Sequence, residues 1–169
     1  MNKSVLFFSL LIISSISFSS CVCYSFKGIS IPPDINTFYV ENFKNKTVTA
    51  PVDIEVRFSE ALRSKIRNES RLKFQETEPD ILFEGDVVGY NISAEAPQEG
   101  NTVALNKLDI VVSVKYTNKT NEKLNYTRNF SFFQTYPGDQ DLTNVQDDLI
   151  KRIFDQIVER IFNDTFTTW

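Results

Sequence analysis

The sequence predicts an α+β domain of two layers, with a four-stranded sheet and two helices on one of its faces. Apolar and polar residues alternate along 105–117, as they do in a strand that buries one face. Apolar residues recur every three or four positions along 51–68 and 144–163, which is typical of helices that bury one side. Strands and helices segregate along the chain in the order β-α-β-β-β-α, which favours two layers around an antiparallel or mixed sheet.

The first two elements are a short strand and a helix. Residues 37–43 largely alternate and predict the strand, and residues 45–50 form a polar connection. Pro51, favoured in the first turn of a helix, opens the helix at 51–68. The buried stripe of this helix is expected to consist of Ile54, Phe58, Leu62 and Ile66.

Three strands are expected next, at 80–94, 105–117 and 124–136. Gly85 and Gly89 interrupt the first of them and predict a β-bulge or close packing there. In the second strand one face carries Leu108, Ile110, Val112, Val114 and Tyr116, and the other carries Lys107, Asp109, Ser113 and Lys115 beside Val111. The third places Tyr126, Phe130 and Phe132 on the core face, after a turn at 118–122.

The last element is a long helix at 144–163, preceded by Pro137 and Gly138, which end the sheet. Thr143 and Gln146 predict a capping box at its start. Its apolar residues form two adjacent rows, Leu149, Ile153, Ile157 and Ile161 in one and Ile150, Phe154, Val158 and Phe162 in the other. Such a wide apolar surface suits a helix that lies across a sheet. The other sheet face is then polar and available to a partner or ligand.

Residues 1–20 have the anatomy of a secretory signal, with Lys3 followed by an apolar run at 5–13 that is too short for a stable membrane span. Phe18-Ser19-Ser20-Cys21 resembles a lipobox, although Phe18 stands where an aliphatic residue is usual. We therefore expect Cys21 to be acylated and 21–36 to form a lipidated N-terminus and tether. A single domain at 37–169 follows. The alternative is a plain secretory signal that leaves Cys21 and Cys23 as unpaired thiols.

Composition excludes several classes of function. The chain has no histidine, which removes the commonest general base and metal ligand. Its two cysteines are too few for a zinc site, and no metal or other cofactor is expected. Without residues 1–20 the net charge is −5, which argues against general nucleic-acid binding. Seven N-x-S/T triplets are interpreted as chance matches in an Asn-rich chain.

Several short motifs, in their order and spacing, resemble one bacterial family. They are Cys21-x-x-Tyr24-Ser25-Phe26, Ile31-Pro32-Pro33-Asp34, Phe83-Glu84-Gly85, Ala104-Leu105-Asn106-Lys107-Leu108 and a terminal helix that ends in Phe166 and Trp169. Together they resemble the outer-membrane LPS-assembly lipoproteins, the LptE family, and the resemblance covers essentially the whole mature chain. Cys23 departs from that pattern.

The resemblance implies a lipid-anchored protein at the outer membrane, facing the periplasm, that is not an enzyme. It implies association with a large β-barrel translocon of the LptD type, whose lumen such proteins partly plug. It also implies help in delivering lipopolysaccharide (LPS) to the outer leaflet, with LPS itself a second partner. The alternative is another periplasm-facing lipoprotein that binds lipid or peptidoglycan and has no role in LPS transport.

Three cations are candidate contacts for lipid phosphates or acidic groups of the barrel wall: Lys107, Lys115 and Arg128. The sequence predicts that they share one strand face, and the alternative is ordinary solubilising charge. Asp109 and the pair Asp147-Asp148 are candidates for acid–base chemistry in a hydrolase with an unusual site. The favoured interpretation makes Asp109 part of a solvated strand face and the pair a partner of the helix dipole.

Overall fold

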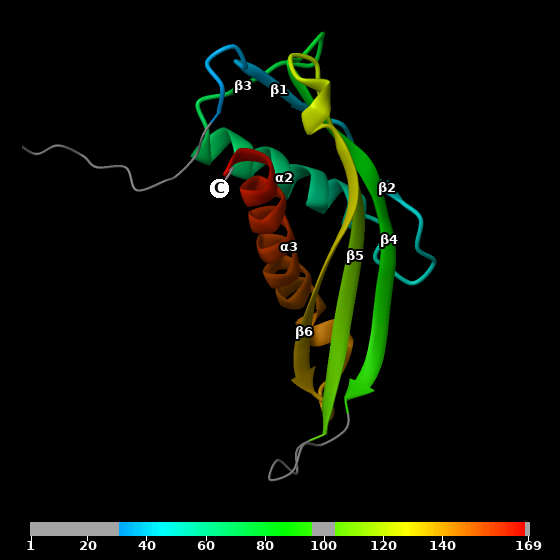
Figure 1. The fold of residues 1–169 in the computed structure, drawn as a ribbon. Helices are drawn as coiled ribbons and strands as arrows, with labels where there is room; N and C mark the ends of the chain where they lie inside the picture. The colour runs from blue at the N-terminus through cyan, green and yellow to red at the C-terminus, as the bar shows by residue number, and fades with distance from the viewer. Residues whose placement is uncertain (1–30, 96–103, 168–169) are drawn as a thin grey trace, which may run out of the picture.

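The computed structural model describes residues 31–95 and 104–167 and has two layers, a sheet and two helices packed on one of its faces (Figure 1). Cys21, the predicted lipidation site, lies outside the described residues. The elements follow the order β1 (Thr37–Val40), β2 (Lys44–Asn45), α2 (Ile54–Glu69), β3 (Lys73–Phe74), β4 (Ile81–Glu95), β5 (Leu105–Asn118), the 3₁₀ turn η1 (Glu122–Leu124), β6 (Tyr126–Pro137) and α3 (Leu142–Phe166).

The sheet is larger than the sequence predicted. In the described residues it has six strands in the order β3-β1-β4-β5-β6, with β2 also pairing with β4. The expected four strands and the order β-α-β-β-β-α are therefore corrected. The two additional strands, β2 and β3, have two residues each, too few to show an alternation of apolar and polar residues.

Three long antiparallel strands, β4, β5 and β6, form the body of the sheet, and the short strands β1 and β2 pair in parallel with β4. The register of β4 against β5 shifts between Val87 and Gly89, which confirms the predicted bulge. Because an extra residue reverses the alternation, Ile81, Phe83 and Val87 face the helices before the bulge, and Tyr90 does so after it.

The core lies between the helices and one face of the sheet. The predicted stripes are confirmed: Ile54, Phe58, Leu62 and Ile66 of α2 are buried, as are both apolar rows of α3. The predicted core face of β5 is buried from Leu108 to Tyr116. Phe58 joins the two helices, since its ring packs edge-on against Phe154 with the ring centres 5.1 Å apart.

The ends of the helices differ from the prediction. Pro51 lies in the turn before α2, where its carbonyl oxygen accepts from the Ile54 amide. The predicted capping box of Thr143 and Gln146 is wrong, because Asp141 caps α3 by accepting from the Thr143 amide. Gln146 instead donates to the Tyr90 hydroxyl at 2.8 Å and ties α3 to β4.

Residues 31–36, which the sequence assigned to the tether, pack against the domain. Ile35 is buried in the core, and its amide donates to the Pro32 carbonyl oxygen. Asp80 then fastens β1 to the start of β4, since its carboxylate accepts from the amides of Asn36 and Thr37 and from the Thr37 hydroxyl. These three donors, the Asn36 amide first, lower the pKa of Asp80 below its usual value.

Candidate functional surface

The sheet face that points away from the helices is polar, and we call it the outer face. Its side chains come from alternate positions of the three long strands: Glu84, Asp86, Asn91, Ser93 and Glu95 of β4, Lys107, Asp109, Val111, Ser113 and Lys115 of β5, and Thr127, Asn129, Ser131 and Phe133 of β6. These side chains are at least partly accessible to solvent. The outer face therefore presents hydrogen-bonding groups and charges, and neither of the helices in the described part of the chain lies over it (Figure 1).

The outer face holds two of the three predicted cations, at its opposite ends. The Lys115 ammonium is 2.7 Å from a Glu84 carboxylate oxygen. The Lys107 ammonium is 3.9 Å from Glu95 and also lies 5.3 Å from the centre of the Phe133 ring. Eight positions separate the two lysines along β5, about 27 Å of extended strand. They are separate charges, each with a carboxylate partner, and not one basic patch.

Arg128 lies on the opposite face, so the prediction that the three cations share a face is wrong. It stands across from Val114, a buried residue, and its guanidinium pairs with Asp164 of α3 at 2.8 Å. The same guanidinium lies 5.1 Å from the centre of the Tyr126 ring. Burial raises the pKa of Tyr126 to about 12, which keeps its phenol protonated. Arg128 therefore clamps β6 to the last turns of α3.

A groove of about 280 Å³ opens where the chain between β1 and β2 passes the outer face. Residues of both charges line it, with Lys115 and Glu84 from the sheet and Lys44 and Glu41 from the chain between β1 and β2 and the start of β2. Ser113 and Thr127 contribute hydroxyls. This arrangement suits a ligand or partner surface with both donors and acceptors.

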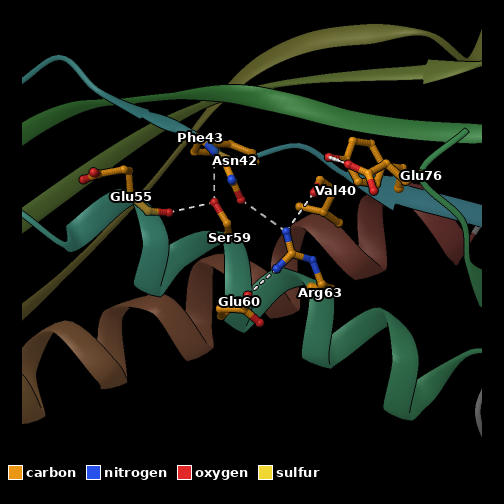
Figure 2. Close-up of polar contacts among 9 residues, drawn as sticks. Val40, Asn42, Phe43, Glu55, Ser59, Glu60, Arg63 and Glu76 are labelled. Atoms are coloured by element: carbon orange, nitrogen blue, oxygen red, sulfur yellow. Dashed lines mark hydrogen bonds and ion pairs between the residues drawn. The ribbon is translucent and has the colours of Figure 1, made fainter.

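The wall formed by residues 41–44 is held by α2 (Figure 2). The Arg63 guanidinium donates to the Val40 carbonyl oxygen at 3.0 Å and to the Asn42 side chain, and it also pairs with Glu60. The Ser59 hydroxyl accepts from the Phe43 amide at 2.9 Å. Because the helix supplies these partners, the predicted strand at 37–43 ends at Val40, and Phe43 turns into the core.

Gly85 leaves room for this turn. A Cβ atom on Gly85 would come within 2.8 Å of the Phe43 ring and 2.0 Å of the Ser113 carbonyl oxygen. Both distances are too short for nonbonded atoms, so the position requires glycine.

Asp147 and Asp148 form ion pairs, whereas Asp109 lies on the outer face. Asp147 accepts from Arg57 of α2 at 2.8 Å, and Asp148 pairs with Arg152 at 2.5 Å along α3. Asp109 is half-buried on the outer face between Asn91 and Phe133. Among residues 31–95 and 104–167, no cluster of three or more acidic or cysteine side chains could hold a metal ion. No helix in these ranges is long and apolar enough to cross a membrane.

The partners of the lysines, Glu84 and Glu95, were missed at the level of sequence because they belong to another strand. Their pairing depends on the register of β4 against β5, including the bulge. The placement of Arg128 did have a signal, since it has the same parity as Tyr126 and Phe130, which were predicted to face the core.

The fold recurs in bacterial proteins of known structure, two of which are lipoproteins. Rare lipoprotein B from Shewanella oneidensis is 13% identical with a TM-score of 0.51, over 76% of this chain and 92% of that one. Lipoprotein B from Nitrosomonas europaea is 15% identical with a TM-score of 0.50, over 79% and 82%. Protein CT253 from Chlamydia trachomatis is 10% identical with a TM-score of 0.51, over 78% and 98%.

No curated protein sequence matches the chain. The LptE family, described as lipopolysaccharide-assembly, matches residues 35–165, which run from the buried Ile35 to the last turn of α3. This match spans most of the chain and nearly all of the described fold. The chain therefore belongs to the LptE lipopolysaccharide-assembly family.

Proposed function

We propose that this protein is a lipid-anchored component of LPS assembly at the outer membrane, facing the periplasm, which acts by fitting against a β-barrel translocon and partly plugging its lumen. The observation that carries the proposal is the family match over residues 35–165. The family is non-catalytic, and the action proposed here is binding. The ion-paired acids described above support a role without bond chemistry.

The chemistry of the outer face supports contact with a barrel wall. Barrel interiors are polar, and their walls carry charged and hydrogen-bonding side chains. Ser113, Asn129 and Ser131 offer short polar groups at the centre of the outer face, with Lys115 and Lys107 towards its ends. Such a surface can exchange its water for hydrogen bonds to a polar wall, and its two lysines already have carboxylate partners when they are buried there.

Affinity purification of the full-length lipoprotein from outer membranes tests the proposal. We expect a large β-barrel protein to co-purify in a stable ratio and to be identified by mass spectrometry. Depletion of the lipoprotein should lower the amount of LPS at the cell surface. Recovery of peptidoglycan or phospholipid without a barrel protein, together with normal surface LPS, would favour the alternative envelope-binding role.

Charge reversal separates the contributions of the two faces. The variant Lys107→Glu/Lys115→Glu alters only the outer face, whereas Arg128→Glu alters the clamp to α3. We expect the double variant to fold and to lose most of the co-purified barrel or LPS. Lys151→Glu, on the exposed side of α3, is the matched control and should retain both. Unchanged association of the double variant would rule out Lys107 and Lys115 as contacts.

Acylation of Cys21 is tested separately from partner binding. Cys21→Ser should abolish incorporation of labelled palmitate and release the protein from the membrane fraction, because attachment depends on the acyl chains. Cys23→Ser should leave both unchanged. A Cys21→Ser protein that still carries palmitate would show that the anchor is elsewhere.

A further inference from the structure

The far half of β4 has an open edge in the described residues. β1 pairs with Ile81, Leu82 and Phe83, and β2 pairs with Asp86 and Val87. Beyond the bulge, within residues 31–95 and 104–167, β4 pairs only with β5 up to Glu95. The chain after β2 is bonded to this edge at Tyr90, where the Thr49 hydroxyl donates to the Tyr90 carbonyl oxygen at 3.1 Å. Residues 46–49 also border a surface hollow that reaches Asn91 and Ile92.

The direction of the backbone groups on this edge follows from that hydrogen bond. The Tyr90 carbonyl points away from β5, and a strand presents alternate residues to the same edge. Ile92 and Ala94 therefore offer their amides and carbonyls outward. Ile92 is also 51% exposed, although it faces the helix side beside the buried Leu108. An unpaired edge with a half-exposed isoleucine is a template for another strand.

The other edges of the sheet are protected. Along β6, the Arg160 guanidinium reaches the Ser131 carbonyl oxygen, Arg128 is clamped to Asp164, and the strand ends at Pro137. β3 is only two residues long and begins with Lys73. Short strands, prolines and charged side chains are the usual means of preventing strand addition. From Asn91 to Ala94 β4 carries none of these, and the first charge after this stretch is at Glu95.

We propose that the 91–95 edge of β4 pairs with the same edge of a second copy of this chain, antiparallel about a two-fold axis at Ser93. In this register Ile92 lies opposite Ala94 of the second copy and exchanges backbone hydrogen bonds with it, four in total by symmetry, as expected for two such pairs. The pairing leaves the Thr49 bond at Tyr90 intact.

The side chains of this edge complement one another in that register. On the helix side, Ile92 is covered by Ala94 of the second copy, so two apolar groups meet. On the outer face, Asn91 lies opposite Glu95 of the second copy, and an amide can donate to a carboxylate there. Ser93 meets itself on the axis. No like charges oppose one another, which favours a second copy of this chain over a strand of unrelated sequence.

A cysteine placed on the axis tests the pairing, in the mature lipoprotein with Cys23→Ser to remove the other thiol. Ser93 and its symmetry mate would form a pair without mutual backbone hydrogen bonds, in which Cβ atoms lie about 4.5–5.5 Å apart, close to disulfide range. Ser93→Cys is expected to give a covalent dimer under mild oxidation. Asn91→Cys, equally exposed on the same strand, is the matched control, because its symmetry mate would be four residues further along the partner strand.

Sedimentation in detergent completes the test without a disulfide. The unaltered protein should show a concentration-dependent monomer–dimer equilibrium, and Ile92→Lys should weaken the dimer at least tenfold while leaving the circular dichroism spectrum unchanged. A monomer at all concentrations overturns the proposal. Equal cross-linking of the two cysteine variants, or dimers that Ile92→Lys does not weaken, also overturns it. The proposal is independent of the proposed function, since neither outcome depends on a barrel or on LPS.

Discussion

The two faces of the same three strands differ in what they contribute. On the helix side β5 buries Leu108, Ile110, Val112 and Val114 completely, and these side chains pack in one core with α2 and α3. On the outer face Lys107, Asp109 and Lys115 alternate with them and remain accessible. The helix side of the sheet therefore contributes most of the stability, and the residues of the outer face are available for binding. The variants below are ordered by expected effect and test this division.

The largest effect is expected from truncating one phenylalanine on each face. Phe83, fully buried under the helices, packs against Tyr116 with ring centres 5.1 Å apart, whereas Phe133 on the outer face is 50% exposed. Phe83→Ala should lower the free energy of unfolding by about 4 kcal/mol, since it leaves a cavity in the core. Phe133→Ala should cost about 1 kcal/mol or less. Urea denaturation measures both, and equal losses would contradict the division.

The second largest loss of stability is expected from a substitution at Gly85, which the Phe43 ring lies against. Gly85→Ala adds a single carbon atom that would collide with the Phe43 ring and the Ser113 carbonyl oxygen. Overpacking of this kind costs about 1–3 kcal/mol, and we expect the upper part of that range. Ser113→Ala, which removes an oxygen from the outer face of the neighbouring strand, is the control and should change stability by less than about 0.5 kcal/mol. A stable Gly85→Ala protein would mean that residues 41–44 can shift.

The sequence was most informative where one face is buried over many residues. The rows of α2, α3 and β5 were predictable because burial imposes periods of 3.6 and 2 on long elements. The pair β2 and β3 was not predictable, because two residues define no period. The end of β1 at Val40 depends on Arg63 and Ser59, side chains of a helix that follows it in the chain.

Prediction of the outer face was limited in a similar way. Lys107 and Lys115 were placed correctly by alternation alone. Their carboxylate partners could not be predicted, because they depend on the register of β4 against β5. The two lysines are also too far apart along β5 to form one basic patch with each other. Arg128 was misplaced although its parity with Tyr126 and Phe130 indicated the helix side. The alternation within β6 therefore predicts better than a residue's charge which side of the sheet its side chain lies on.

The third largest loss of stability is expected at Asp80, which links β1 to β4, and it should depend on pH. Asp80→Asn removes a carboxylate that accepts three hydrogen bonds, and it should cost about 1.5–3 kcal/mol at neutral pH. Because the folded pKa of Asp80 lies below the model-peptide value of 3.8, its stabilisation is present above that value and is lost as the pH falls through the folded pKa. Urea midpoints of the two proteins should therefore converge in acid.

Asp139→Asn provides the control for the acid titration, since Asp139 is exposed in the turn after β6. It should show no large loss at neutral pH. The contrary result is a difference in urea midpoint between Asp80→Asn and the unaltered protein that stays constant down to the lowest pH at which both fold. That result would show that the charge of the Asp80 carboxylate does not hold the two strands together.

The smallest effect is expected for the ion pair on the outer face. The Lys115 side chain is 55% exposed and that of Glu84 is 31% exposed, so solvent screens their attraction. Lys115→Ala and Glu84→Ala should each change stability by about 0.5 kcal/mol, and a double-mutant cycle should give a coupling energy below about 1 kcal/mol that falls with added salt. A coupling of several kcal/mol, insensitive to salt, would mean that the outer face also holds the fold together. Stability would then constrain the residues of this face as strongly as binding does.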